Sequence, residues 1–455
     1  MSWCGKEIVE GSVDMNKDLT TGRPERVLWS FALPMLLSVA FQQVYSIADS
    51  VIVGKFISGD ALAAVSSSYP ITMIFIAIAT GFSTGAGVVI SRQFGGGEYG
   101  KMRTSSSTSV ISAVVASAVL SLLGLILAAP VLKLLDTNAD IMGDSVLYLN
   151  IYCYGLIFLF LYNICNGIFT ALGDSRTPLM LLIFSSVLNI VLDLFFVISL
   201  RWGVGGAAWA TLIAQGLSSV LAWLLLMQRL RRIETDEGYS RFSLRALRTI
   251  LKIAVPSILQ TSFVSVGNLF IQARVNYFGV DVVAGYGAAI KLNTFAVTCF
   301  TTVSSAVSSY TAQNMGAKHI DRVVSGLRAG IKMMLIIAIP FTLLFTVFGG
   351  GMMGLFAGES DAAIVEIGQK MLLIITPFYI FVGAKIVCDG ILRGSGAIYA
   401  FTTSTLIDLV LRVVLCYIFS VFWEATGIWL AWPVGWVIST FISYGFYISG
   451  RWKKY

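Results

Sequence analysis

Four polar side chains in apolar stretches of this chain are candidates for binding a cation. Asp49 lies near the far end of the run 27–54, Asn189 and Asp193 are one helical turn apart in a later run, and Thr211 lies in the next. A carboxylate inside a membrane is costly and by default marks an ion or proton pathway. Carboxylate, amide and hydroxyl oxygens are hard ligands that suit Na⁺. Two neighbouring carboxylates would also repel each other, so the pair could instead hold a proton near neutral pH.

Helical rise places these groups at similar depths. At about 1.5 Å per residue, Asp49 lies roughly 33 Å along its run. Asn189 and Asp193 lie roughly 18 and 24 Å from the same side of the membrane. Thr211 lies roughly 9 Å below the opposite surface, and Tyr148 is also near that surface. The sequence therefore predicts one polar site. The alternative is a set of separate polar residues that satisfy nearby backbone groups, with Asp49 wetted by lipid headgroups.

A second set of charges lies in the C-terminal half. Lys385 and Asp389 are four residues apart, as are Asp408 and Arg412. Residues at this spacing can pair on one face of a helix, and charges within membranes usually pair. We therefore expect a structural ion-pair network. The alternative is that Lys385 and Asp408 exchange partners between conformations.

The composition indicates a polytopic membrane protein. Of 455 residues, 57% are hydrophobic and 12% are charged, with a mean hydropathy of +0.83, whereas soluble domains are about one quarter charged. The single histidine, His319, lies in a loop, and the six cysteines show no paired spacing. We expect no enzyme, because no metal or nucleophile cluster is visible. The net charge of +7 does not indicate a nucleic-acid partner, and we expect no cofactor beyond a coupling ion.

Apolar runs long enough to cross a bilayer recur twelve times. The predicted organisation is an N-terminal segment 1–26, an N lobe 27–228, a linker 229–247, a C lobe 248–449 and a tail 450–455. We place the spans at 27–54, 61–90, 105–129, 145–170, 177–200, 205–228, 248–276, 282–312, 325–349, 364–392, 398–421 and 427–449.

The loops show a strong asymmetry in basic residues. Nearly all loop Lys and Arg residues fall on one side of the predicted membrane, and the other side holds only Lys55, Lys133 and Arg201. Basic loops stay in the cytoplasm. The sequence therefore predicts a multi-pass protein of the bacterial cell membrane with both termini and the 229–247 linker in the cytoplasm.

Short motifs of the first half recur in the second. Because six spans is an even number, the halves are parallel repeats, an arrangement typical of transporters. Pro34, which we expect to kink the first span, recurs as Pro256, whereas Asp49 has an apolar counterpart near Ile271. The proline thus belongs to the shared frame and the carboxylate to one lobe. The recurring motifs are Arg26-(x)7-Pro34 and Arg248-(x)7-Pro256, Gln93-(x)2-Gly96 and Gln313-(x)2-Gly316, Gly167-Ile-Phe-(x)3-Gly173 and Gly390-Ile-Leu-(x)3-Gly396, and Gly205 and Gly427.

Together these residues resemble the multidrug and toxic compound extrusion (MATE) transporters. The resemblance rests on Pro34 with Asp49 fifteen residues on, Asn189-(x)3-Asp193 and Thr211, and it covers all twelve spans. It implies an all-α membrane protein in which two pseudo-two-fold-related six-helix bundles form a V. It also implies that Asp49, Asn189, Asp193 and Thr211 form an N-lobe site for the coupling cation, H⁺ or Na⁺.

Four further residues match positions of the family's polar network and drug cavity. They are Gln42, Tyr45, Tyr148 and Asn166. The helical rise per residue, however, places Asn166 near the cytoplasmic end of its span, away from Asp49.

The chain departs from one branch of that family. Some members carry a Glu in span 7 and an Asp in span 10, where this sequence has Ser265 and Val382. We therefore expect coupling to rest on the N lobe.

The resemblance implies an antiporter that works by alternating access. It would export cationic or amphipathic organic compounds in exchange for inward H⁺ or Na⁺. The expected partners are a small organic substrate and membrane lipid, and we expect a monomer.

The nearest alternative is a flippase for lipid-linked saccharides of the same superfamily. Such a protein needs a cationic central cavity to hold a pyrophosphate, and the candidate residues all lie in the C lobe. A channel is less well supported, since single asymmetric carboxylates do not form the ring of ligands that filters use. The candidate pyrophosphate-binding residues are Lys385, Arg412, Arg274 and Lys291.

Overall fold

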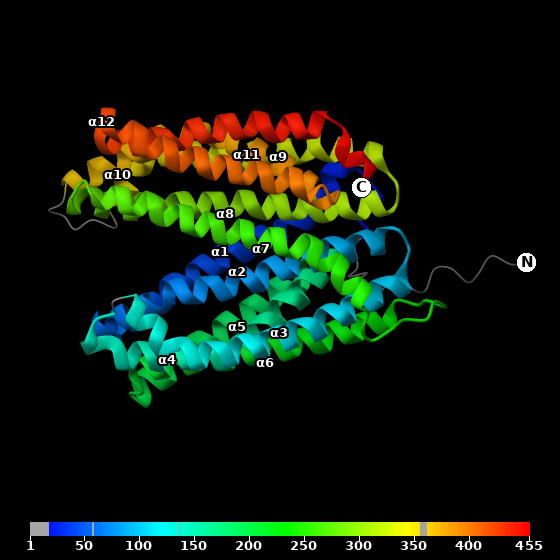
Figure 1. The fold of residues 1–455 in the computed structure, drawn as a ribbon, viewed down its shortest axis with the longest axis horizontal. Helices are drawn as coiled ribbons and strands as arrows, with labels where there is room; N and C mark the ends of the chain where they lie inside the picture. The colour runs from blue at the N-terminus through cyan, green and yellow to red at the C-terminus, as the bar shows by residue number, and fades with distance from the viewer. Residues whose placement is uncertain (1–17, 57–58, 136, 355–361) are drawn as a thin grey trace, which may run out of the picture.

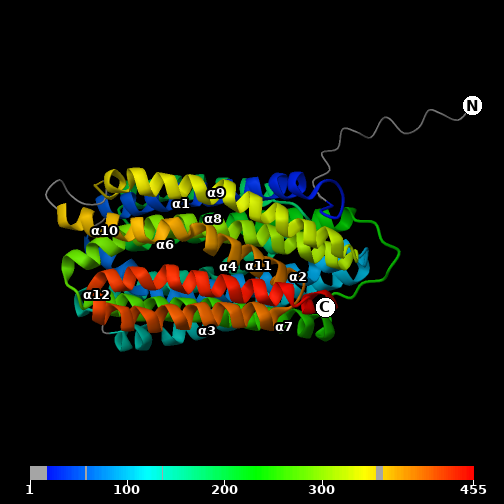
Figure 2. The same ribbon diagram turned by 90° about the horizontal axis from the view of Figure 1, so that it is seen from above.

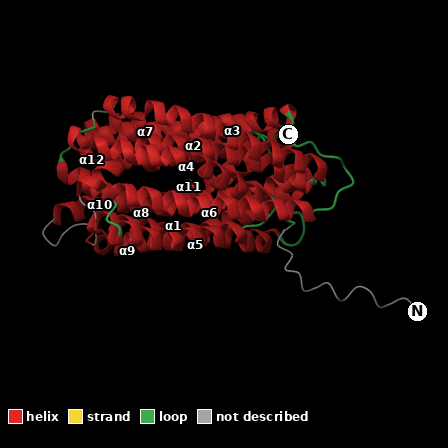
Figure 3. Ribbon diagram, turned by 90° about the horizontal axis from the view of Figure 1, so that it is seen from below, coloured by secondary structure: helices red, strands yellow, loops and turns green. Residues whose placement is uncertain are grey.

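Every regular element in the described part of the chain is a helix, as Figures 1 and 3 show. Helices are expected because backbone groups in lipid have no water to bond and must pair within their own segment. The computed structural model describes residues 18–56, 59–135, 137–354 and 362–455. It does not describe the side chains of residues 47–62.

Most helices extend a few residues beyond the predicted apolar runs into the short turns between them, and α12 joins the last two predicted runs. They are α1 (Pro24–Phe56), α2 (Gly59–Gly95), α3 (Tyr99–Leu134), α4 (Ala139–Ala171), α5 (Arg176–Asp193), the π-helical η1 (Leu194–Ser199), α6 (Gly203–Arg232), α7 (Leu244–Asn276), α8 (Val280–Gly316), α9 (Ile320–Gly354), α10 (Ala362–Ile375), the 3₁₀ turn η2 (Thr376–Phe378), α11 (Tyr379–Gly394), α12 (Ile398–Ile448) and the 3₁₀ turn η3 (Arg451–Lys454).

Eleven helical segments among the described residues are long and apolar enough to cross a membrane. The last, α12, has 51 residues, which corresponds to about 75 Å and far exceeds a hydrocarbon core of about 30 Å. Its backbone leaves the helical region at Trp423 and Glu424, where φ reaches +50°. The orange and red halves of α12 lie side by side in Figures 1 and 2. A hydrogen bond between the Ser404 and Ser443 hydroxyls also joins them.

Two hydrophobic cores hold the molecule together. One is built mainly from α2, α3, α4 and α6, and the other from α8 to α12. The first helix of each half, however, begins in the core of the other half. Leu28 and Phe31 of α1 are almost fully buried in the core of the C-terminal half, and Ile250 and Ala254 of α7 are buried in that of the N-terminal half. Helices α1 and α7 therefore tie the two cores together.

The repeated Gln-(x)2-Gly motifs at Gln93 and Gln313 face each other where α2 and α8 end. A Cβ on Gly95 would overlap the carbonyl oxygen of Gln313, and a Cβ on Gly316 would overlap that of Arg92. The Gln313 side chain also donates to the Ala171 carbonyl at 2.8 Å. Small residues let helix backbones approach this closely. The repeat in the sequence therefore corresponds to a tight contact between the lobes.

Candidate functional site

The N lobe brings together three of the four residues predicted to bind the cation. Asn189 and Asp193 lie on one face of α5 and are 3% and 0% exposed. The Asn189 amide nitrogen donates to the Asp193 carboxylate at 3.1 Å, and its oxygen accepts from the Thr211 backbone N–H at 3.0 Å. The Thr211 hydroxyl lies 3.4 Å from the same amide. Since buried polar groups are costly unless they are bonded, the amide holds α5 and α6 in register.

Helix α1 joins this cluster through Tyr45. The Tyr45 hydroxyl lies 2.6 Å from the amide nitrogen of Asn189 and accepts its hydrogen bond. Asp49 falls among the side chains outside the description, so its place in the cation site stays a prediction. The Tyr45 contact shows that its own face of α1 turns toward α5.

The backbone changes its winding at Asp193. This residue ends α5, and the π-helical segment η1 (Leu194–Ser199) follows directly. Single π-helical turns within longer helices are frequent at functional sites. The apolar sequence of η1 gives no sign of this change, so sequence reasoning missed it.

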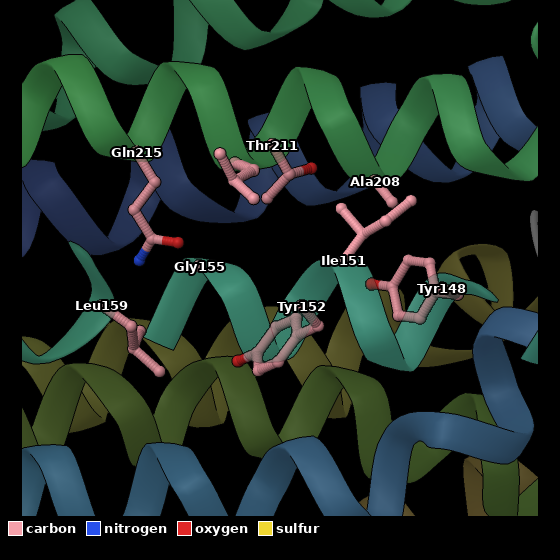
Figure 4. Close-up of a pocket in the computed structure, with 9 residues that line it drawn as sticks. Tyr148, Ile151, Tyr152, Gly155, Leu159, Ala208, Thr211 and Gln215 are labelled. Carbon is pink, nitrogen blue, oxygen red and sulfur yellow. The ribbon is translucent and has the colours of Figure 1, made fainter. Parts of the chain in front are cut away.

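A small pocket between α4 and α6 adjoins the polar cluster (Figure 4). Thr211 lines it together with Tyr148, and the structure thus brings together two residues that the sequence placed at similar depth. Tyr152 and Gln215 also line it but were not predicted, although each is one helical turn after a predicted residue and shares its face. The other lining residues are Ile151, Gly155, Leu159, Ala208 and Leu212.

Two residues assigned to the polar network have no described hydrogen bond to the cluster. Gln42 is exposed on α1. Asn166 lies 18 residues after Tyr148 on α4, which corresponds to about 27 Å. Its side chain lies near that of Tyr162, one helical turn earlier on α4. The structure agrees with the depth count in separating Asn166 from the cation site.

Pro34 lies inside α1, and the helix continues on both sides of it. The nearby Ser38 hydroxyl donates to the Pro34 carbonyl at 3.0 Å. A kink at this proline stays a prediction.

The C lobe contains the predicted ion-pair network, in the interior between α11 and α12. The Lys385 ammonium lies 2.9 Å from Asp389 and 3.8 Å from Asp408, and all three side chains are buried. The Ser443 hydroxyl donates to the second oxygen of Asp389 at 2.7 Å. Lys385 therefore binds two carboxylates that the sequence placed on different spans.

Arg412 does not pair with Asp408 as the spacing suggested. No ion pair joins these two described residues; the Arg412 guanidinium lies 4.6 Å above the ring of Trp432. An arginine over an aromatic face gains a cation–π interaction. The prediction missed it because Trp432, on the second half of α12, lies close to Arg412 only after the chain turns at Trp423 and Glu424.

The two other basic residues of the flippase alternative lie in different surroundings. Arg274 donates to the Ser420 hydroxyl at 2.7 Å and lies against the rings of Tyr277 and Tyr417. Lys291 is exposed on α8. Lys385, Arg412 and Arg274 therefore already have partners within the protein.

The arrangement of the N-lobe cluster suits a cation more than a reaction. A buried carboxylate, an amide and a hydroxyl from two neighbouring helices can share a Na⁺ or a proton. Among the described residues, no group of three or more His, Cys, Asp or Glu side chains comes together as a metal site.

Comparison with known proteins finds matches over nearly the whole chain. The MatE family model matches residues 34–195 and 256–418, one region in each half. The probable multidrug resistance protein YpnP of Bacillus subtilis (strain 168) is 30% identical over 437 residues, covering 96% of this chain and 97% of that protein. The FAD transporter of Shewanella oneidensis is 26% identical and covers 68% of this chain and 70% of its own length. A solved outward-facing structure of a multidrug resistance MATE family transporter superposes with a TM-score of 0.90 at 22% identity, covering 98% and 100% of the two chains.

Proposed function

The chain belongs to the MatE family of multi-pass membrane transporters, and from this premise we propose that it is an antiporter that exports organic cations or amphipathic compounds. The counter-ion is inward H⁺ or Na⁺, bound in the N lobe. The observation that supports this most directly is the buried cluster of Asp193, Asn189 and Thr211 with Tyr45 of α1. A carboxylate buried within a membrane is costly, and cation binding would repay that cost.

The proposed topology has twelve crossings. The two halves of α12 each cross once, and the termini, with the seam at Gly95 and Gly316, lie on the cytoplasmic side. This orientation follows from the basic loops, and it gives two bundles of six spans.

The proposed mechanism depends on α1, which contacts both lobes. Its first turns, with Leu28 and Phe31, are buried in the core of the C-terminal half, while Tyr45 is bonded to α5. A cation that binds beside Asp193 would change the contacts of α1 with α5 and hence the relative energy of the lobe arrangements. Coupling follows if substrate and cation favour different arrangements.

The flippase alternative receives less support. Lys385 and Arg412 are buried inside the C lobe, where Asp389, Asp408 and Trp432 already contact them. A pyrophosphate would have to displace these partners.

The proposal can be tested in proteoliposomes that contain a fluorescent organic cation, with the Na⁺ and pH gradients varied separately. We expect Asp193→Asn to lower gradient-driven export at least tenfold, because the amide cannot carry the charge that binds the cation. The matched control is Asp144→Asn, which changes an exposed carboxylate of the same lobe and should export normally. Unchanged gradient-driven export by the Asp193 variant would refute the N-lobe site.

The substrate class can be examined in the same vesicles. Since one relative is an FAD transporter, FAD serves as an anionic competitor. We expect organic cations to compete for export and FAD not to compete.

A further inference from the structure

A basic groove lies between α1 and α9, at the end where both helices begin. Arg23 just before α1, Arg26 of α1, and Arg328 and Lys332 of α9 line a space of about 790 Å³. The start of α1 (blue) lies against α9 (yellow) in Figures 1 and 2. Glu25 and Lys332 form an ion pair of 2.6 Å across the contact. The groove therefore joins a helix of the N-terminal half to a helix of the C-terminal half.

The groove has an excess of positive charge. Arg23, Arg26 and Arg328 are exposed, and no carboxylate among the described residues lies within ion-pair distance of any of them. Glu25 offsets only the charge of Lys332. A surface with clustered cations and so few anions attracts a negatively charged group.

The same faces of both helices become apolar farther along. On α1, Leu33 and Leu37 follow Arg26 at helical spacing and are 51% and 44% exposed. On α9, Ile336 and Leu343 follow Lys332 at helical spacing and are 57% and 59% exposed. Each helix thus presents a basic head and an exposed apolar stripe in one line.

We propose that this groove binds an anionic phospholipid. Its phosphate lies between Arg26 and Arg328, and its acyl chains run along the apolar stripes beyond Ser30 and Lys332. Basic pockets between membrane helices bind anionic lipid headgroups. A free phosphate would use only the head of the site, whereas a phospholipid matches both the charges and the stripes that continue them.

This site would link the composition of the membrane to the contact between the lobes. The first turns of α1 are already packed on the core of the C-terminal half through Leu28 and Phe31. A lipid that binds both Arg26 and Arg328 adds a second link between α1 and α9. The inference concerns binding only and does not depend on the identity of the exported compound or the coupling ion.

The test measures lipid binding to the purified full-length chain in neutral detergent by native mass spectrometry. The probes are phosphatidylglycerol, phosphatidylcholine of the same acyl chains, and inorganic phosphate. We expect phosphatidylglycerol to bind at least tenfold more tightly than phosphatidylcholine. The double variant Arg26→Gln/Arg328→Gln should weaken phosphatidylglycerol binding about thirtyfold, since each basic side chain near an anionic lipid contributes roughly fivefold.

The control is Arg231→Gln/Arg232→Gln, which removes two exposed arginines from the last turn of α6 and should change binding less than about twofold. An equal loss in this control overturns the proposal, because the attraction would then be a general surface effect. Equal binding of the two lipids by the unchanged protein overturns it without any variant. Inorganic phosphate that displaces phosphatidylglycerol at equal concentration also overturns it, because the acyl chains would then contribute nothing.

Discussion

The two lobes bury charge in opposite ways. In the N lobe, Asp193 is bonded to the neutral amide of Asn189, beside the hydroxyl of Thr211. In the C lobe, the Lys385 ammonium lies between two carboxylates. A carboxylate bonded to a neutral amide can accept a cation, whereas one that already faces an ammonium gains little from another. We therefore propose coupling as the role of the N-lobe carboxylate and structural support as the role of the C-lobe charges.

The largest expected effect is the removal of the C-lobe ammonium. Lys385→Met leaves Asp389 and Asp408 buried beside each other without it, and we expect the free energy of unfolding to fall by about 3–5 kcal/mol. Denaturation in detergent measures this loss. Lys370→Met, on the exposed surface of α10, is the control and should change stability little. If the Lys385→Met protein is fully stable but has lost transport, Lys385 has a functional role and the structural interpretation of the C-lobe network is wrong.

A smaller loss of stability is expected at Ser443. Ser443→Ala removes the hydroxyl that donates to Asp389, and hydrogen bonds to charged groups contribute about 1.5–3 kcal/mol. The measurement is again the free energy of unfolding, together with export in proteoliposomes, which should stay near normal. Ser439→Ala is the matched control, because this buried hydroxyl one turn earlier bonds only the Trp436 carbonyl in the described structure. Equal losses in the two variants would contradict a specific role for Ser443 in the network.

The smallest expected effect concerns the Thr211 hydroxyl in the N lobe. Thr211→Val keeps the side-chain shape but removes the hydroxyl beside Asn189. We expect about a tenfold loss in affinity for the coupling cation, equivalent to about 1.4 kcal/mol, and nearly unchanged stability. The cation dependence of export measures the affinity. Thr170→Val removes a hydroxyl that bonds only the Asn166 carbonyl in the described structure and should leave the cation dependence unaltered.

Much of the fold could be predicted from local pattern. The apolar runs, the linker and the repeat all follow from hydropathy and short motifs, because lipid demands long helices with internally bonded backbones. The incorrect prediction concerns a contact between residues that are far apart in the sequence. The Asp408–Arg412 pair was a sound expectation from spacing, yet Arg412 lies over Trp432 once α12 turns back on itself. Spacing within one helix cannot show what a neighbouring helix offers.

The candidate site was predictable to a similar extent. Membrane depths calculated from the helical rise placed Asn189, Asp193 and Thr211 at one level and Asn166 at another, because the rise is nearly constant. It could not show that Tyr45 bonds Asn189, because that contact depends on the rotation of α1 against α5. The π-helical turn after Asp193 was equally invisible, since η1 reads as an ordinary apolar run.

The sequence by itself determined the membrane class, the two-fold repeat and the polar residues of each half, because these depend on composition, periodicity and motif spacing. Only the tertiary structure decided which charges meet, since partners far apart in the chain are chosen by helix packing. It gave Lys385 two carboxylates from different helices. It also buried the start of α1 in one core while Tyr45 is bonded to the other half. That placement, which no local pattern encodes, makes α1 one of the links between the two lobes.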